Sequence, residues 1–107
     1  MDKKETINLY KNRKRTGGVF AIKNTVLNKW FVDCTNDIGA AKNRFDFMGD
    51  SYTKIARDYK AQNGEGFIFE VLEELEKGET QTEKEFKDDV VLLKSLWLEK
   101  LTDRDLY

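Results

Sequence analysis

Residues 17–25 read GGVFAIKNT and residues 28–36 read NKWFVDCTN, and these two stretches decide the fold. Both are rich in β-branched and aromatic residues, which favour strands, and a short polar turn separates them. The pattern predicts a β-hairpin with strands at 18–24 and 29–34. Because apolar side chains occur on both faces of these strands, we expect helices to cover both faces of the sheet.

Four helices and one further strand are predicted around this hairpin. The predicted helices lie at 2–15, 37–47, 52–62 and 83–101, and the third strand lies at 67–72. We therefore expect a single domain over residues 1–107, with an N-terminal helical arm at 1–16 and a core at 17–101. Its predicted class is α+β, with a small three-stranded, mainly antiparallel sheet flanked by helices on both faces.

Short polar residues before three of these helices are candidates for N-caps, because their side chains accept hydrogen bonds from free backbone N–H groups. Thr35 or Asn36 is the expected cap of the helix at 37–47, and Asp50 or Ser51 that of the next helix. Thr82, followed three residues later by a glutamate, predicts a capping box at the start of the last helix.

The composition excludes several kinds of chemistry. The 107 residues contain no histidine, which excludes histidine-based acid–base catalysis and histidine-containing zinc sites. Cys34 is the only cysteine, so the chain forms no internal disulfide, and we expect a reducing, cytoplasmic location. No apolar stretch is long enough to span a membrane. The net charge of −1 gives no overall attraction to nucleic acid, so any such binding needs a local basic patch.

The hairpin resembles the paired signature of the GIY-YIG nuclease family. Residues 18–20 (GVF) and 31–33 (FVD) stand at the positions of the two motifs, and Phe31 follows Phe20 by eleven positions. The polar segment at 35–38, the turn and strand at 63–73 and the pair Trp97-Leu98 resemble later parts of the family's domain. The likeness spans residues 17–101 in the family's order and implies the family's fold.

The resemblance also places the family's functional positions on this chain. The tyrosines of the two motifs fall on Phe20 and Phe31, whose phenyl rings have no proton or lone pair to offer an attacking water. The glycine of the second motif falls on Asp33. A carboxylate at this position adds negative charge beside an anionic substrate.

Two further positions implied by the resemblance carry replaced side chains. The family's arginine, which stabilises charge on the phosphate, falls on Ala41, with Lys42 and Arg44 close by in the sequence. The family's metal-binding glutamate falls on Lys94, whose charge repels a cation. We therefore expect no catalytic residue at Phe20, Phe31, Asp33, Ala41 or Lys94, and no metal or other cofactor.

The resulting hypothesis is a catalytically degenerate GIY-YIG-like domain that acts as a binding or interaction module, with DNA or RNA as the first expected partner. One alternative is a divergent Mg²⁺- or Mn²⁺-dependent endonuclease that uses relocated groups such as Arg44 and Glu85. Another alternative is a protein–protein interaction module.

Basic side chains in two segments are candidates for contacts with phosphates. They are Lys11, Arg13, Lys14, Arg15, Lys42 and Arg44. The simpler interpretation is a solvated basic run on a chain that is rich in both signs of charge.

Aromatic and aliphatic residues suggest two further surfaces. Phe20, Phe31 and Trp30 either line a pocket that stacks a flat ligand or belong to the core of the sheet, and we favour the core. The last helix has apolar residues off its main stripe, at Val91 and Leu98 among others, which suggests a homodimer through this helix.

Overall fold

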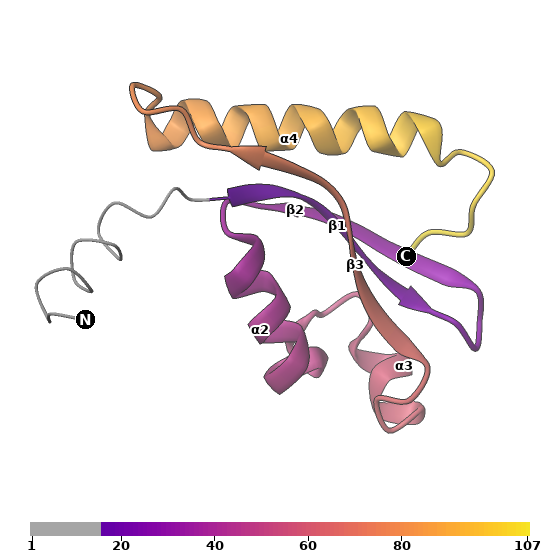
Figure 1. Cartoon of the computed structure of the whole chain (residues 1–107). Coiled ribbons are helices and arrows are strands. Elements are labelled where there is room, and N and C mark those ends of the chain that lie inside the picture. The colour runs from indigo at the N-terminus through magenta and orange to yellow at the C-terminus, as the bar shows by residue number, and fades with distance from the viewer. Residues whose placement is uncertain (1–15) are drawn as a thin grey trace, which may run out of the picture.

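The computed structural model describes residues 16–107, which form a three-stranded antiparallel sheet covered by helices (Figure 1). In chain order the elements are β1 (Thr16–Asn24), β2 (Lys29–Thr35), α2 (Ile38–Met48), η1 (Gly49–Ser51), α3 (Ala56–Ala61), β3 (Phe67–Glu76) and α4 (Glu83–Lys100). The strand order is β2-β1-β3. The predicted α+β class and the hairpin are confirmed, whereas the helix predicted at 2–15 lies outside the described residues.

The central strand β1 has a buried layer on each of its faces. Phe20 and Ile22 point into the layer formed with α2 and the segment before α3, and Val19 and Ala21 point into the layer formed with α4. Figure 1 shows α4 on one side of the sheet and α2 and α3 on the other. The expectation that helices cover both faces is therefore confirmed.

Gly18 begins the first motif and has a conformation that requires glycine. Its φ is +146°, and a Cβ added there would overlap the carbonyl oxygen of Glu73 on β3. The β1–β3 register shifts immediately afterwards, between Val19 and Phe20. Because a side chain at Gly18 would push β3 away, the glycine allows the close pairing of the two strands.

The helices on the α2 face differ from the prediction in two respects. Asp37 caps α2 by accepting a hydrogen bond from the N–H of Ala40, so the predicted caps, Thr35 or Asn36, are wrong. The helix predicted at 52–62 is wrong at its start, because α3 begins only at Ala56 and neither Asp50 nor Ser51 caps it.

The physical reason for the short α3 is the burial of the residues that precede it. Tyr52 has an extended backbone, with φ −78° and ψ 98°, after the 3₁₀ turn η1. Tyr52 and Ile55 are both buried in the cluster around Phe20. A regular helix through these positions is replaced by turns that bury both side chains on the sheet.

The last two elements, β3 and α4, lie where the sequence predicts them, and β3 is longer than predicted. β3 runs to Glu76, four residues beyond the predicted end, because its charged second half pairs with the start of β1. The capping box at Thr82 is present with both of its hydrogen bonds, which confirms the predicted start of α4. Within residues 16–107, no helix combines the length and the apolar character that crossing a membrane requires.

The C-terminal residues fold back onto the outer edge of the hairpin (Figure 1). The N–H of Trp30 donates to the carbonyl of Asp105 at 2.9 Å, and the N–H of Tyr107 donates to the carbonyl of Trp30 at 2.8 Å. The Tyr107 hydroxyl donates to Asp58 at 2.7 Å and accepts from the buried amide of Asn24 at 2.9 Å. These contacts tie the end of the chain to β1, β2 and α3.

Candidate functional site

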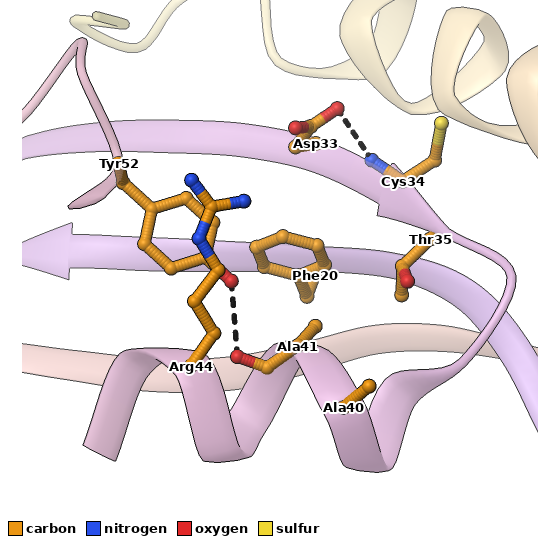
Figure 2. A pocket seen from close by; sticks show the side chains of 8 residues that line it. All are labelled: Phe20, Asp33, Cys34, Thr35, Ala40, Ala41, Arg44 and Tyr52. Atoms are coloured by element: carbon orange, nitrogen blue, oxygen red, sulfur yellow. Dashed lines mark hydrogen bonds between the residues drawn. The ribbon is translucent and has the colours of Figure 1, made fainter. Parts of the chain in front are cut away.

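A pocket of about 210 Å³ lies between the end of β2, the first half of α2 and Tyr52 (Figure 2). The residues that line it are Phe20, Asp33, Cys34, Thr35, Ala40, Ala41, Arg44 and Tyr52. Three of the positions that the family resemblance singled out, Phe20, Asp33 and Ala41, therefore share one pocket. The structure brings them together from three different elements.

Aromatic rings form the inner wall of this pocket. The ring of Phe20 meets the ring of Tyr52 edge-on, with centroids 6.1 Å apart, and the ring of Phe31 lies 5.9 Å from Tyr52 on another side. Both phenylalanines at the tyrosine positions of the family thus pack around one tyrosine that comes from elsewhere in the chain. Phe20 is 2% exposed, so it is primarily a core residue whose edge reaches the pocket.

Tyr52 carries the only phenolic hydroxyl among the residues that line the pocket. Its hydroxyl donates to the backbone carbonyl of Ala41 at 2.9 Å, and burial raises the pKa of this hydroxyl above its ordinary value. The proton is therefore held on the oxygen, which makes Tyr52 a poor base near neutral pH. Tyr52 is not at the start of a helix, as predicted, because its backbone is extended, and this conformation has no local sequence signal.

Arg44 stands at the α2 side of the pocket and is held in a fixed orientation. Its Nε donates to Oγ of Ser51 and its Nη2 donates to the carbonyl of Ser51, both at 2.7 Å. The guanidinium carbon lies 4.1 Å from the centre of the Tyr52 ring, a cation–π contact that Figure 2 shows. These three contacts immobilise a cation whose remaining surface faces outward.

Asp33 stands on the opposite, β2 side of the pocket and is paired with Lys94 of α4. Lys94 Nζ donates to Asp33 Oδ1 at 3.2 Å, and the backbone N–H of Cys34 donates to the same oxygen at 2.8 Å. Both charged side chains are roughly one-third exposed. The two residues that differ in charge from the family pattern, 61 positions apart in the sequence, therefore neutralise each other.

The residues at this pocket do not fit the divalent metal that the family resemblance implies. Asp33 is the only carboxylate that lines the pocket, and an ammonium group already binds it. Across residues 16–107, nowhere do three acidic or cysteine side chains gather as a metal site needs. Magnesium is usually held by one or two carboxylates together with water and substrate phosphates, so a single carboxylate that Lys94 already binds is a poor ligand for it.

Cys34 also lines the pocket, and its surroundings favour the thiol over the thiolate. Burial and the neighbouring charge of Asp33 raise the pKa of the Cys34 thiol above its ordinary value. Because the thiolate is the reactive form, we assign no nucleophilic role to this cysteine.

The remaining candidates lie outside the pocket. Lys42 is on the exposed side of α2, where it pairs with Asp46 at 2.5 Å. Glu85 is fully exposed at the start of α4 and accepts a hydrogen bond from the N–H of Thr82 within the capping box. Lys11, Arg13, Lys14 and Arg15 lie outside the described residues.

The hypothesis of one ligand pocket formed by Phe20, Phe31 and Trp30 is wrong. Trp30 packs in the cluster on the α4 face of the sheet, whereas Phe20 and Phe31 belong to the cluster on the opposite face. Successive side chains of a strand point to opposite faces, so the adjacent residues Trp30 and Phe31 cannot line the same pocket. The preferred assignment of these rings to the core is consistent with the packing.

The fold and the positions gathered at this pocket define a GIY-YIG-like domain. Among solved structures, the chain is similar to the catalytic domain of the homing endonuclease I-TevI, with 26% sequence identity and a TM-score of 0.58. The match covers 80% of this chain and 88% of that domain. No family model and no curated protein sequence matches the chain. The resemblance to GIY-YIG nucleases drawn from the hairpin is thereby confirmed.

Proposed function

We propose that this GIY-YIG-like domain binds nucleic acid without cleaving it. The observation that carries the proposal is the ion pair between Asp33 and Lys94 at 3.2 Å. The resemblance maps the family's metal-binding glutamate onto Lys94, so an ammonium group stands at that position, and Asp33 neutralises it. A phosphate can still approach this pocket, whereas a metal ion has no set of ligands there.

The other positions of the family site support the same conclusion. Phe20 and Phe31 cannot orient or deprotonate a water, and Ala41 cannot stabilise charge on a phosphate. Loss of a single electrostatic stabiliser at a catalytic site commonly lowers the rate by about 10²–10³. Replacement of the metal ligand removes the Lewis acid on which the family's mechanism depends.

Binding is favoured by the charges that remain at the pocket. Arg44 is fixed by Ser51 and Tyr52, and within the described residues no carboxylate pairs with its guanidinium. The neighbouring carboxylate of Asp33 is compensated by Lys94. Because Lys94 compensates Asp33, Arg44 is the uncompensated charge at the pocket, and its guanidinium suits one phosphate group.

Fluorescence anisotropy with labelled single-stranded and duplex oligonucleotides tests this proposal. We expect salt-sensitive binding at low ionic strength that persists in EDTA and needs no Mg²⁺. Arg44→Ala should weaken binding about tenfold, whereas Arg57→Ala, which removes an exposed arginine of α3, should change it less than twofold. Failure of every oligonucleotide to bind at low salt would remove nucleic acid as the partner.

The divergent endonuclease is the alternative enzyme function, and one observation favours it. Arg44 does lie at the pocket, as a relocated phosphate-stabilising cation would have to. Glu85, however, is engaged in the capping box at the start of α4. The part of α4 that reaches the pocket is at Lys94, which contacts Asp33 and lies about 13 Å further along the helix axis than Glu85. The relocated pair of Arg44 and Glu85 therefore lacks a common site.

A protein–protein role is the second candidate, because α4 exposes apolar side chains. Leu92 and Leu96 are 60% and 45% exposed, and they lie one turn apart on one flank of the helix. Val91 projects about 140° away from Leu96, so the apolar residues form two flanks instead of one continuous stripe. We propose the Leu92–Leu96 flank as the contact of a homodimer, and a monomeric mass in sedimentation at high concentration would exclude it.

A further inference from the structure

Arg44 keeps hydrogen-bond donors available at the mouth of the pocket. Ser51 accepts one hydrogen bond from Nε and one from Nη2. Within residues 16–107, no group accepts a hydrogen bond from Nη1. One face of the guanidinium lies on Tyr52, so the other face and the Nη1 hydrogens remain available to a ligand, and the already fixed side chain loses little further entropy on binding.

The opposite side of the pocket offers a hydrogen-bond acceptor. Lys94 and the N–H of Cys34 both donate to Oδ1 of Asp33. No hydrogen bond within the described part of the chain reaches Oδ2. Oδ2 of Asp33 can thus accept a hydrogen bond from an amino group. The ammonium group of Lys94 compensates the negative charge of the carboxylate.

The size and lining of the pocket limit what can lie between Asp33 and Arg44. In Figure 2 the Phe20 ring and the methyl groups of Ala40 and Ala41 lie below both the Asp33 carboxylate and the Arg44 guanidinium, so the pocket lining is apolar on its α2 side. The volume of about 210 Å³ is below the range of about 300–1,000 Å³ typical of sites for drug-sized ligands. A small flat group with an apolar face and a polar edge fits this space.

A nucleobase is such a group, provided that it is unpaired. In a duplex the faces of each base are stacked and its Watson–Crick edge is occupied, so a base enters a protein pocket only from a single strand or after extrusion. Carboxylates accept hydrogen bonds from the exocyclic amino group of cytosine, and adenine and guanine also carry such a group. Thymine and uracil carry only carbonyl acceptors at the corresponding position.

We propose that the pocket between β2 and α2 binds one unpaired nucleotide whose base carries an exocyclic amino group. The Asp33 carboxylate accepts from that amino group, and Arg44 binds the adjacent phosphate. This inference rests on the proposed nucleic-acid binding and specifies its substrate as single-stranded. Asp33 is the residue that selects the base, and Arg44 is the residue that anchors the backbone.

Anisotropy titrations in EDTA with labelled oligo(dC), oligo(dA), oligo(dT) and a mixed-sequence duplex test this inference. We expect the intact chain to bind oligo(dC) and oligo(dA) about five- to tenfold more tightly than oligo(dT), and the duplex most weakly. Asp33→Asn should abolish or reverse the base preference, because an amide can also donate to a carbonyl. Arg44→Ala should weaken all single strands by a similar factor, with Arg57→Ala as the matched control.

Chemical-shift mapping with cytidine 5′-monophosphate provides a second measurement that does not depend on any variant. The amide signals of residues 33–35 and 40–44 should shift most. Shifts confined to other parts of the chain would overturn the assignment of the pocket.

The possible failures are distinguishable. Equal affinity for oligo(dC), oligo(dA) and oligo(dT), or tighter binding of the duplex, would overturn the inference and leave nucleic-acid binding standing. Equal losses in Arg44→Ala and Arg57→Ala would overturn the role of Arg44 as the anchor. Absence of binding to any of the four probes would contradict the proposed function itself.

Discussion

Lys94→Ala breaks the ion pair on which our interpretation of the pocket depends, and its effect on stability can be worked out from the geometry. Two unit charges 3.2 Å apart attract each other by about 1.3 kcal/mol in water. Exposed pairs contribute only about 0.2–1 kcal/mol when measured, because salt screens them and their side chains lose entropy. With side chains 32% and 37% exposed, the pair belongs near the upper end of that range.

We therefore expect a coupling free energy of about 0.5–1 kcal/mol between Lys94 and Asp33. The measurement is a double-mutant cycle of Lys94→Ala and Asp33→Ala, with urea unfolding followed by tryptophan fluorescence. Lys87→Ala on the same helix, combined with Asp33→Ala, is the matched control and should give a coupling below about 0.3 kcal/mol. High salt should reduce the Lys94 coupling.

A coupling of zero between Lys94 and Asp33 at low salt would refute the reasoning. The two side chains would then be independent, and Lys94 would be available to other groups. A coupling of opposite sign would mean that the pair is net destabilising, because removing water from the charge of Asp33 costs more than its attraction to Lys94 returns. Either result would remove the ion pair as an explanation for the charges at this pocket.

Three further changes test the fold. Gly18→Ala should lower the free energy of unfolding by at least about 2 kcal/mol in urea titrations, because the residue has positive φ and faces a neighbouring strand. Tyr107→Phe removes the hydroxyl that donates to Asp58 and should cost about 1–2 kcal/mol in the same assay. Burial raises the pKa of Tyr52, so its contribution to stability is complete below about pH 10 and decreases as the pH rises through its folded-state pKa. Thermal unfolding from pH 8 to 11 should show this loss, and Tyr52→Phe should reduce it.

Each of these expectations has a contradicting result. A Gly18→Ala variant with an unchanged free energy of unfolding would mean that the sheet tolerates a side chain between β1 and β3. For Tyr107, the control is Tyr59→Phe, since no hydrogen bond within residues 16–107 involves the Tyr59 hydroxyl. Equal losses of unfolding free energy in Tyr107→Phe and Tyr59→Phe would mean that the hydrogen bonds of the Tyr107 hydroxyl add no stability. If Tyr52→Phe loses as much thermal stability between pH 8 and 11 as the original chain, groups other than Tyr52 cause that loss.

The parts of the fold that could be predicted from the sequence are those with local causes. The alternating and β-branched residues of the hairpin, and Thr82 followed by Glu85, act over a few positions, and the structure has both as predicted. The end of β3 was missed because Glu73 to Glu76 have the composition of a loop. Their strand conformation comes from pairing with β1, which is a contact between distant segments.

The pocket was only partly predictable for the same reason. Counting from the family motifs placed Phe20, Asp33 and Ala41 in one site, and the structure brings all three together. The pairing of Asp33 with Lys94 has no local sequence signal, because it joins β2 to α4 across 61 positions. Tyr52 was missed because its position depends on turns whose shape is determined by burial on the sheet.

The most direct test of the central claim is the rate at which the purified chain nicks supercoiled plasmid DNA in the presence of Mg²⁺ or Mn²⁺. We predict that the plasmid remains supercoiled, because Lys94 binds the one carboxylate that lines the pocket and no side chain there is suited to activate water. Reproducible nicking that disappears in Arg44→Ala would contradict the account and establish the domain as a nuclease with relocated groups.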